Sequence, residues 1–231
     1  MYTALLTIDD FSTRNTPAMM DYLNARGIQP IFFAEGRKVE AHYQEAVYAL
    51  QNGAIVGNHS YSHPAFSSLK PEACIREIEQ CERVLDQLYK DSGVERIWRP
   101  FRFPYGDKGG TNKAMIQQYL RDHSFHKVDD TRIRDSFWHE FGLDQDVDTF
   151  WTFDFAEYQI RPGSDFTVAS VWDRMHDAAP QNGSVLFGEG NHHILLLHAH
   201  DETEALVPQY YKLFIDHLLE NGMVFDAPRF L

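Results

Sequence analysis

Two adjacent carboxylates stand near the start of the chain, directly after an apolar run. Residues 5–8 have the length of a short buried strand, and Asp9 and Asp10 follow at once. Neighbouring carboxylates raise each other's pKa, and burying either costs free energy, so such a pair is rarely kept for stability. A metal cation can neutralise one carboxylate while the other accepts a proton. By itself an Asp-Asp pair is more often a turn or helix cap, so partners are needed elsewhere.

Two histidines, His59 and His63, follow the short apolar stretch 54–58 in the sequence His-Ser-Tyr-Ser-His. Imidazoles four residues apart share one face if the segment forms a helical turn, which is a common spacing of metal ligands. Alone, such a pair is more often a pair of surface or capping histidines. Two histidines and one carboxylate, however, form a typical catalytic zinc site with open positions for water and substrate.

Two further segments carry groups that could assist a hydrolytic reaction. Arg102 could pair with a carboxylate of the first strand, and the turn 104–106 could aim a backbone N–H at a developing oxyanion. The apolar run 194–198 ends in His198, which could be a general acid. The structural alternatives are an exposed arginine beside a turn and a hydrogen-bonded histidine.

The segment 151–158 combines carboxylates with aromatic rings. Asp154 or Glu157 could pair with His198 and tune its charge. The rings of Trp151 and Tyr158 are candidates for stacking on a sugar, although most aromatic residues of a globular protein pack in its core. We therefore expect this segment to lie beside His198 and to contribute to substrate binding.

Strand and helix patterns alternate along the chain. We predict strands at 2–8, 29–33, 54–58, 96–102, 149–155, 194–198 and 223–226, and helices at 13–26, 39–52, 71–90, 111–122, 168–179 and 204–221. This order implies a parallel sheet with helices outside, either a barrel or an open doubly wound sheet. The polar residues above fall at the C-terminal ends of strands, where active sites of such folds lie. No glycine-rich phosphate loop follows the first strand, which argues against nucleotide binding.

Length and composition indicate one α/β domain spanning 1–231. The chain has 231 residues, 43% of them hydrophobic, and no linker-like segment divides it. Its formal net charge of −13 argues against nucleic acid and anionic membrane surfaces as partners. No apolar run reaches the roughly 18 residues that a membrane-spanning helix needs.

Two observations concern the compartment. Cys74 and Cys81 lie seven residues apart in a predicted helix, which separates them by about 10 Å and puts them beyond disulfide reach. Met1 leads directly into the first strand without a recognisable signal peptide. We therefore expect a cytoplasmic protein, unless an export signal has been removed.

Four segments, taken in chain order, resemble motifs of the polysaccharide deacetylase family, also known as the NodB homology domain or carbohydrate esterase family 4. Residues 7–10 read Thr-Ile-Asp-Asp where the family has Thr-Phe-Asp-Asp, and 59–63 match His-(Ser/Thr)-x-x-His. Residues 102–106 read Arg-Phe-Pro-Tyr-Gly and look like Arg-Pro-Pro-Tyr-Gly, and 196–198 look like the motif Leu-x-His. The resemblance spans most of the chain.

The resemblance implies a distorted (β/α)7 barrel and a metal-dependent hydrolase that removes acetyl groups from a carbohydrate. The expected cation is one zinc ion, with cobalt or another divalent ion as an alternative. Seven residues acquire implied roles: Asp9 as general base, Asp10, His59 and His63 as metal ligands, Arg102 as the residue that holds the base, Tyr105 as the donor of a backbone amide to the oxyanion, and His198 as general acid.

The sequence departs from the family in the segment 154–158. Asp154-Phe-Ala-Glu157-Tyr158 stands where the family commonly has Asp-x-x-Asp-Trp. Glu157 is one methylene longer than the residue expected to orient His198, so Asp154 and Glu157 both remain candidates for that role. Tyrosine replaces the stacking tryptophan, which leaves the acceptor sugar open.

The segment 107–150 is long for the gap between these motifs. We expect it either to shape substrate specificity or to be a decoration without a role at the site. His192, His193 and His200 crowd the last predicted apolar strand, and we expect structural or rim positions for them.

Several functions remain open. The favoured one is release of acetate from an N-acetylated or O-acetylated carbohydrate. The alternatives are an O-acetylxylan esterase, a small-molecule amidohydrolase of the same superfamily, and a carbohydrate-binding domain that has lost catalysis. A metal-dependent phosphohydrolase is disfavoured by the acidic charge and by the lack of a second metal cluster in the sequence. The particular sugar and the oligomeric state are not specified by the sequence.

Overall fold

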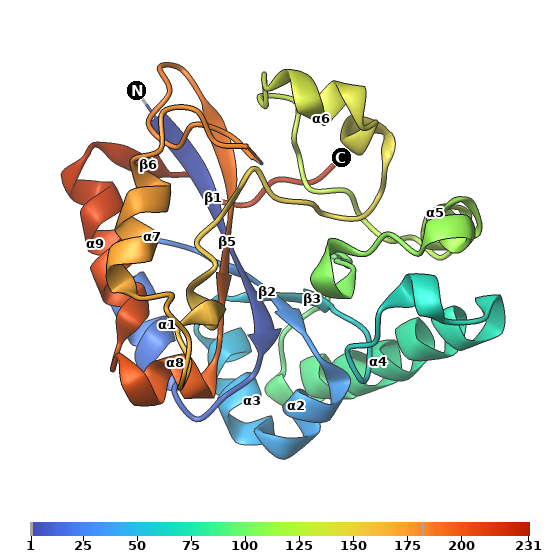
Figure 1. Ribbon diagram of the computed structural model, residues 1–231. Helices are drawn as coiled ribbons and strands as arrows, with labels where there is room; N and C mark the ends of the chain where they lie inside the picture. Colours follow the sequence, from blue (N-terminus) through green and yellow to red (C-terminus); the bar gives the residue numbers. More distant parts are fainter. Residues whose placement is uncertain (1, 182) are drawn as a thin grey trace.

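A parallel β-sheet forms the centre of the molecule in the computed structural model, which describes residues 2–181 and 183–231 (Figure 1). The long strand β1 (Tyr2–Phe11) pairs with β5 (His192–His198) along almost its whole length. On its other side, β1 pairs with β6 (Met223–Phe225) in its first half and with β2 (Ile31–Ala34) in its second half. Every pair within the sheet is parallel, as the alternation of strands and helices predicts.

The outer strands are β3 (Ile55–Asn58) and β4 (Phe153–Asp154), in the order β3-β2-β1-β5-β4. Irregular segments connect these two edges by backbone hydrogen bonds. Asn58 N–H donates to Pro100 O at 2.9 Å, and Arg102 N–H donates to Asn58 O at 3.0 Å. Thr149 N–H in turn donates to Phe101 O at 2.8 Å, which brings the chain back toward β4. The result is a distorted (β/α) barrel, as expected.

The predicted strand 96–102 is wrong. In place of a ladder, the structure has one isolated bridge between Asn58 and Phe101. Pro100 has no N–H to donate, and a proline within a strand interrupts its ladder. The predicted strand 149–155 is likewise reduced to the two residues of β4.

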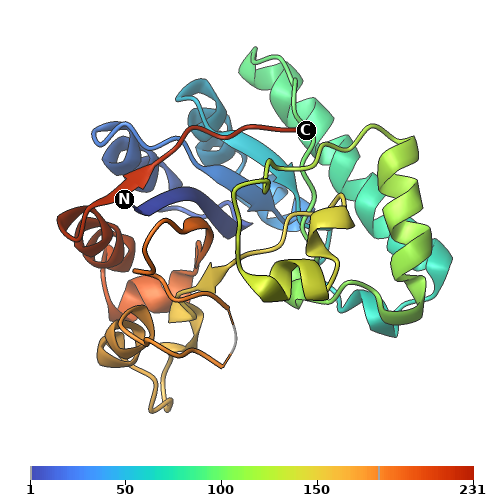
Figure 2. The same cartoon turned by 90° about the horizontal axis from the view of Figure 1, so that it is seen from above.

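Helices and the segment that contains α5 and α6 surround the strands when the molecule is seen from above (Figure 2). The helices are α1 (Thr16–Asn24), α2 (Gly36–Ala41), α3 (Tyr43–Gln51), α4 (Pro71–Ser92), α5 (Lys113–Asp122), α6 (Ser136–Glu140), α7 (Val168–Met175), α8 (Asp201–Leu206) and α9 (Tyr210–Glu220). The described residues contain no helix long and apolar enough to cross a membrane.

Two predicted helices are each divided in two. The helix expected at 39–52 is interrupted at His42, whose φ of −126° and ψ of 50° lie outside the helical region. The helix expected at 204–221 is interrupted between α8 and α9, where Pro208 lacks an N–H and Gln209 has a φ of 60°. Cys74 and Cys81 both lie on α4 as free, buried thiols, in agreement with the expectation of no disulfide.

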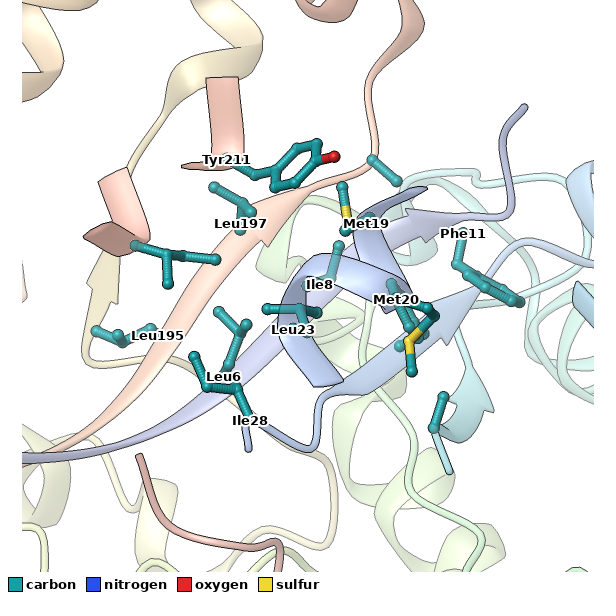
Figure 3. Close-up of a cluster of buried hydrophobic side chains, with 14 of the residues drawn as sticks. Leu6, Ile8, Phe11, Met19, Met20, Leu23, Ile28, Leu195, Leu197 and Tyr211 are labelled. Atoms are coloured by element: carbon teal, nitrogen blue, oxygen red, sulfur yellow. The ribbon is translucent and has the colours of Figure 1, made fainter. Parts of the chain in front are cut away.

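The outer face of the sheet forms the larger apolar core. Leu6 and Ile8 of β1 and Leu195 and Leu197 of β5 alternate along their strands toward the same side (Figure 3). Helix α1 covers them, with Leu23 among its buried residues. This packing fixes the positions of β1, which carries Asp9 and Asp10, and of β5, which ends at His198.

The inner face of the sheet is filled by the segment 107–150. Leu5, Phe33 and Ile194 belong to a second buried cluster, together with Trp138 and Leu143 from that segment. Trp138 is 2% exposed, and its indole N–H donates to Asp130 Oδ2 at 2.8 Å. The segment therefore contributes to the core of the barrel and is more than a surface decoration.

Candidate metal and catalytic site

The predicted site residues converge at the C-terminal ends of the strands. All of them except Arg102 and Glu157 line one cavity of about 280 Å³. Arg102 and Glu157 are 1% and 0% exposed and lie behind its wall. The convergence follows from strand direction, because parallel strands end at the same edge of the sheet. Asp9 and His198, far apart in sequence, are directly paired across β1 and β5.

One carboxylate and two imidazoles form a possible metal centre. Donor atoms of Asp10, His59 and His63 all lie within 4.8 Å of one another. Asp10 Oδ1 is 3.4 Å from His63 Nε2 and 4.0 Å from His59 Nε2. Nδ1 of His59 lies 2.8 Å from Arg102 O, so it carries the proton and leaves the lone pair on Nε2. Burial lowers the pKa of His59 to about 4, which keeps this imidazole neutral at pH 7.

The environment of Asp10 fits a cation. Its Oδ1 is buried and has no hydrogen-bond partner among the residues that the structure describes. Although burial raises the pKa of this carboxyl, the positive charges of His198 and Lys38 are the main causes that lower it to about 2. An ionised oxygen without a donor is costly in a protein interior. A divalent ion held by one carboxylate and two imidazoles would supply the missing partner, as in catalytic zinc sites.

A loop after β3 positions the two histidines, so the helical turn that would place them on one face of a helix does not form. Ser60 and His63 have φ values of 68° and 60°, in the left-handed region. Two hydrogen bonds hold this course: Ser60 N–H donates to Asn58 Oδ1 at 2.8 Å, and His63 N–H donates to Ser60 Oγ at 3.0 Å. Asp10 and Tyr105 also have positive φ, 62° and 59°. Such conformations cost of order 1–3 kcal/mol each and cluster at functional sites.

A buried ion pair holds Asp9. Arg102 NH1 donates to Asp9 Oδ1 and to Thr7 Oγ1, each at 2.8 Å, and Arg102 Nε donates to Thr149 O at 3.0 Å. The guanidinium carbon lies 4.3 Å from the centroid of the Phe33 ring. These contacts fix the direction of one carboxylate oxygen and leave Asp9 Oδ2 facing His59 Nε2 at 3.4 Å.

A second buried pair holds His198. Glu157 Oε1 lies 3.2 Å from His198 Nδ1 and accepts the His198 backbone N–H at 2.5 Å. Burial favours the neutral imidazole, but the negative charge and hydrogen bond of Glu157, with the charges of Asp154 and Asp10, raise the pKa of His198 to about 10. Asp154 Oδ1 instead accepts the Ala156 N–H at 2.7 Å. Of the two candidate carboxylates, Glu157 is therefore the one in direct contact with the imidazole.

Aromatic rings surround the opening of the cavity. The Tyr105 ring meets His63 edge-on, with centroids 4.4 Å apart, and Tyr105 is 68% exposed. The Tyr158 ring lies in the same manner 4.7 Å from His198. Trp151 stacks on Phe150 at 4.1 Å. These rings offer apolar faces beside the polar centre.

Sequence reasoning missed several supporting residues. Thr7 contacts Arg102 and shares the inner face of β1 with Asp9, which the two-residue period of a strand could have indicated. Tyr210 O–H donates to His198 O, a long-range contact that no local pattern signals. Lys38 Nζ lies 4.0 Å from Asp10 Oδ2 and 2.8 Å from Glu35 Oε1.

Arg99, which precedes Arg102 by three residues, and the histidines of the last predicted apolar strand lie outside the polar centre or at its rim. Arg99 pairs with Glu82 of α4 at 2.6 Å. His192 contacts Thr3 Oγ1 at 2.8 Å, and His193 contacts Thr152 Oγ1 at 3.1 Å, both as buried residues. His200 lines the cavity, and its side chain accepts the Thr203 N–H at the start of α8.

The parallel strands and the helices around them place the protein in the class of distorted (β/α) barrels, here with an acidic, histidine-rich centre at the C-terminal ends of the strands. Residues 2–126 match the family model described as polysaccharide deacetylase, which covers more than half of the chain. The chain belongs to the polysaccharide deacetylase family.

Curated relatives match over part of their own length. Chitin deacetylase 1 of Cryptococcus neoformans var. grubii is 31% identical over 114 residues, which cover 49% of this chain and 23% of the relative. The peptidoglycan-N-acetylmuramic acid deacetylase PdaC of Bacillus subtilis is 29% identical over 127 residues, which cover 54% and 25%. The chain thus spans about a quarter of these two relatives.

Solved structures share the fold over nearly the whole chain. A family 4 carbohydrate esterase from Streptomyces lividans superposes with a TM-score of 0.62 at 17% identity, covering 97% of this chain and 92% of the other. A family pseudoenzyme from Bacillus anthracis superposes with a TM-score of 0.56 at 21% identity, covering 96% and 62%. At such identities the likeness establishes the fold alone, and the chemistry has to be argued from the site.

Proposed function

We propose that this protein is a metal-dependent hydrolase that removes acetyl groups from an N-acetylated carbohydrate and releases acetate. The observation that carries the proposal is the convergence of Asp10, His59 and His63 around a buried carboxylate oxygen without a hydrogen-bond partner among the described residues. Asp9 lies beside this group with one oxygen held by Arg102 and the other turned toward His59. Curated relatives named chitin and peptidoglycan deacetylases support the substrate class.

Zinc suits the proposed ligand set of two imidazole nitrogens and one carboxylate oxygen, and cobalt is a reasonable substitute. When bound, the cation would supply a Lewis acid that polarises a carbonyl and lowers the pKa of water from 15.7 to about 7. The roles of Asp9, Arg102 and His198 follow from their own contacts.

Asp9 is the proposed general base. Arg102 holds its Oδ1, so Oδ2 is the oxygen available to accept a proton from the attacking water. Asp9 is 3% exposed, and its ion pair with Arg102 gives the buried carboxylate a charged partner. The backbone N–H of Tyr105, in the turn beside His63, is the proposed donor to the developing oxyanion.

His198 is the proposed general acid, oriented by Glu157. Contact with Glu157 places a proton on Nδ1 and keeps the ring protonated at neutral pH, so Nε2 has a proton to give. An amide needs that proton, because its nitrogen is a poor leaving group, whereas an ester depends on it less. The protonated imidazole therefore favours N-acetyl over O-acetyl substrates.

The test is an assay of acetate release from chitooligosaccharides, acetylxylan and cyclic amides, with zinc or cobalt added to the wild-type protein. We expect acetate from the chitooligosaccharides. Asp9→Asn should reduce turnover by about 10²–10⁴-fold, as expected for loss of a general base, while metal remains bound. His59→Ala should lose both turnover and metal. Metal retained after dialysis is measured by atomic absorption.

Three results would contradict the proposal in different ways. Equal metal loss in Asp9→Asn and His59→Ala would contradict the separate roles of base and ligand. Activity on acetylxylan or cyclic amides alone would favour an esterase or a small-molecule amidohydrolase. Sugar binding without any turnover at saturating metal would identify a carbohydrate-binding protein without catalysis. The solved structure of a family pseudoenzyme is the reason to test for this outcome.

A further inference from the structure

Two further histidines face each other between α7 and α9, outside the set of residues that line the catalytic cavity. His176 directly follows α7, and His217 lies in the last turn of α9, two helices that pack side by side (Figure 1). Their Nε2 atoms are 3.0 Å apart, and their ring centroids are 5.0 Å apart. His176 is exposed and His217 is half-buried, so an ion in solution can reach both.

The contacts of His217 leave a lone pair on Nε2. The side-chain amide of Asn221 donates to the His217 backbone carbonyl at 2.9 Å, and the same amide nitrogen lies 3.3 Å from His217 Nε2. A ring nitrogen that faces an amide donor acts as an acceptor, so the ring proton is on Nδ1. Burial lowers the pKa of His217 below 6.5, which keeps the imidazole neutral at pH 7. A neutral imidazole with a free nitrogen is the form that binds a metal.

The separation of the two nitrogens fits one class of metal ion. Two ligands that are 3.0 Å apart and bound at about 2.0–2.1 Å subtend an angle of roughly 90–97° at the ion. Neighbouring ligands of square-planar or tetragonal Cu²⁺ and Ni²⁺ meet at such an angle, and imidazole suits both ions. Tetrahedral Zn²⁺ would need nitrogens about 3.3 Å apart. The pair therefore favours copper or nickel over zinc.

Aromatic side chains hold both imidazole rings in place. The Trp172 ring meets His217 edge-on, with centroids 4.7 Å apart, and the Phe187 ring lies 5.5 Å from His176. Trp172 also packs edge-on against Phe214 of α9, at 5.5 Å. Rings that are already packed lose less side-chain freedom when they bind a ligand. The pair is thus preorganised in the protein without an ion.

The electrostatic surroundings favour a cation at this place. His176 and His217 lie at the C-terminal ends of their helices, where the helix dipole presents a partial negative charge. The chain as a whole carries a formal net charge of −13, which attracts cations. Both effects add to the affinity that the two imidazole nitrogens supply.

We propose that His176 and His217 form a second metal site, which binds a divalent ion of the copper or nickel type between α7 and α9. The two nitrogens supply neighbouring ligands, and water completes the coordination. The bound ion links the two helices and stabilises the folded protein without entering the reaction. This inference is independent of the proposed function, because it uses other residues and needs no acetylated substrate. The competing explanation is an N–H···N hydrogen bond between the two rings.

The experiment is calorimetric titration of the full chain with Cu²⁺, because copper forms the tightest imidazole complexes of these ions. The wild type should bind two equivalents, one at the proposed catalytic centre and one at the histidine pair. His59→Ala and His217→Gln should each bind one, and the double variant should bind none with comparable affinity. Loss of one imidazole of the pair should weaken its site by at least about tenfold, as even the loss of an outer-shell partner can do. His176→Gln should reproduce the effect of His217→Gln.

Tryptophan fluorescence locates the second equivalent. Cu²⁺ quenches an indole ring close to it, and Trp172 lies beside His217. The quenching should persist in His59→Ala and disappear when His217→Gln is added. His123→Gln is the matched control, because His123 is also an exposed histidine that follows a helix and stacks on an aromatic ring, that of Tyr119. It should change neither the stoichiometry nor the quenching, and equal effects of His123→Gln and His217→Gln would overturn the proposal.

Thermal unfolding tests the link between the helices. Ni²⁺ should raise the melting temperature of His59→Ala, because only the folded chain presents both imidazoles together. It should not raise that of His59→Ala/His217→Gln. Equal shifts in the two proteins, or none in either, would leave only the hydrogen bond and overturn the proposal.

The same titrations separate this inference from the proposed function. Copper that is lost in His59→Ala and fully retained in His217→Gln would reject the histidine pair and retain the catalytic centre. Copper that is lost in His217→Gln and unchanged in His59→Ala would retain the pair and contradict the catalytic metal centre.

Discussion

Two buried ion pairs determine what the individual residues can do. Arg102 fixes Asp9, and Glu157 fixes His198, so the proposed base and acid each have one atom held and one atom directed into the cavity. Breaking such a pair by removing one partner leaves a buried charge uncompensated, which is strongly destabilising. Each pair therefore contributes to the conformation of the site and, under the proposed function, to its chemistry.

The His198–Glu157 pair predicts a specific dependence of stability on pH. The pKa of His198 is about 10 in the folded protein, above its value of about 6.5 in an unfolded chain. The folded state thus holds an extra proton between these values. The contribution of this pair to the free energy of unfolding is complete below about pH 6.5. It is lost as the pH rises toward 10, by at most about 1.4 kcal/mol per pH unit.

Urea unfolding of the metal-free protein between pH 7 and 10, with a chelator present, measures this loss. Glu157→Gln serves as the matched variant, because the neutral amide no longer holds the imidazole protonated. Its free energy of unfolding should decline less with pH than that of the wild type. Parallel curves for the two proteins would show that the ion pair does not control the protonation of His198.

Local sequence was informative about the individual groups and less so about their partners. Asp9, Asp10, His59 and His198 could be singled out because each directly follows an apolar run of strand length. The choice between Asp154 and Glu157 could not be made, because it depends on how the chain turns after β4. The structure makes it through the positive φ of Ala156, 55°, which a sequence pattern does not reveal.

At the scale of elements, the site depends on loops as much as on strands. Asn58 closes the edge of the sheet through segment 100–102 and also directs the loop that carries His59 and His63. The sequence predicted a regular strand at 96–102, and the spacing of His59 and His63 would place them on one face only in a helical turn. The strand is replaced by an isolated bridge and the turn by a loop for the same reason: isolated bridges and left-handed residues are set by long-range contacts and not by hydrophobic periodicity.

Gly57 tests this closure directly. A Cβ added there would lie 2.6 Å from Pro100 O and 2.7 Å from Pro100 Cγ, closer than real contacts allow. Gly57→Ala should therefore push β3 away from segment 100–102 and cost about 1–3 kcal/mol, as overpacking does. It should also weaken metal binding, because the displaced strand carries the loop with His59.

Gly53→Ala is the control for Gly57→Ala. Gly53 has a φ of +91°, but an added Cβ would meet nothing within 4 Å, so this substitution strains only a turn. It should lower stability without changing metal affinity. Chemical denaturation and zinc titration of both variants give the comparison. Unchanged metal affinity in Gly57→Ala would mean that the closure does not position the loop.

At the scale of the whole molecule, the barrel brings together residues that span most of the sequence. The alternation of strands and helices was enough to predict the parallel sheet and the edge at which the site lies. The packing of segment 107–150 inside the barrel was beyond such reasoning, because Trp138 and Leu143 lie in no regular amphipathic pattern. That segment also forms one wall of a groove of about 950 Å³ that shares lining residues with the cavity of the site.

Anomalous diffraction from crystals grown with zinc or cobalt tests the central claim most directly. The account predicts one ion per chain, bound by a carboxylate oxygen of Asp10 and by Nε2 of His59 and His63 at about 2.0–2.2 Å. Asp9 should remain paired with Arg102 and outside the set of ligands. An ion bound elsewhere, or bound without Asp10, would contradict the account.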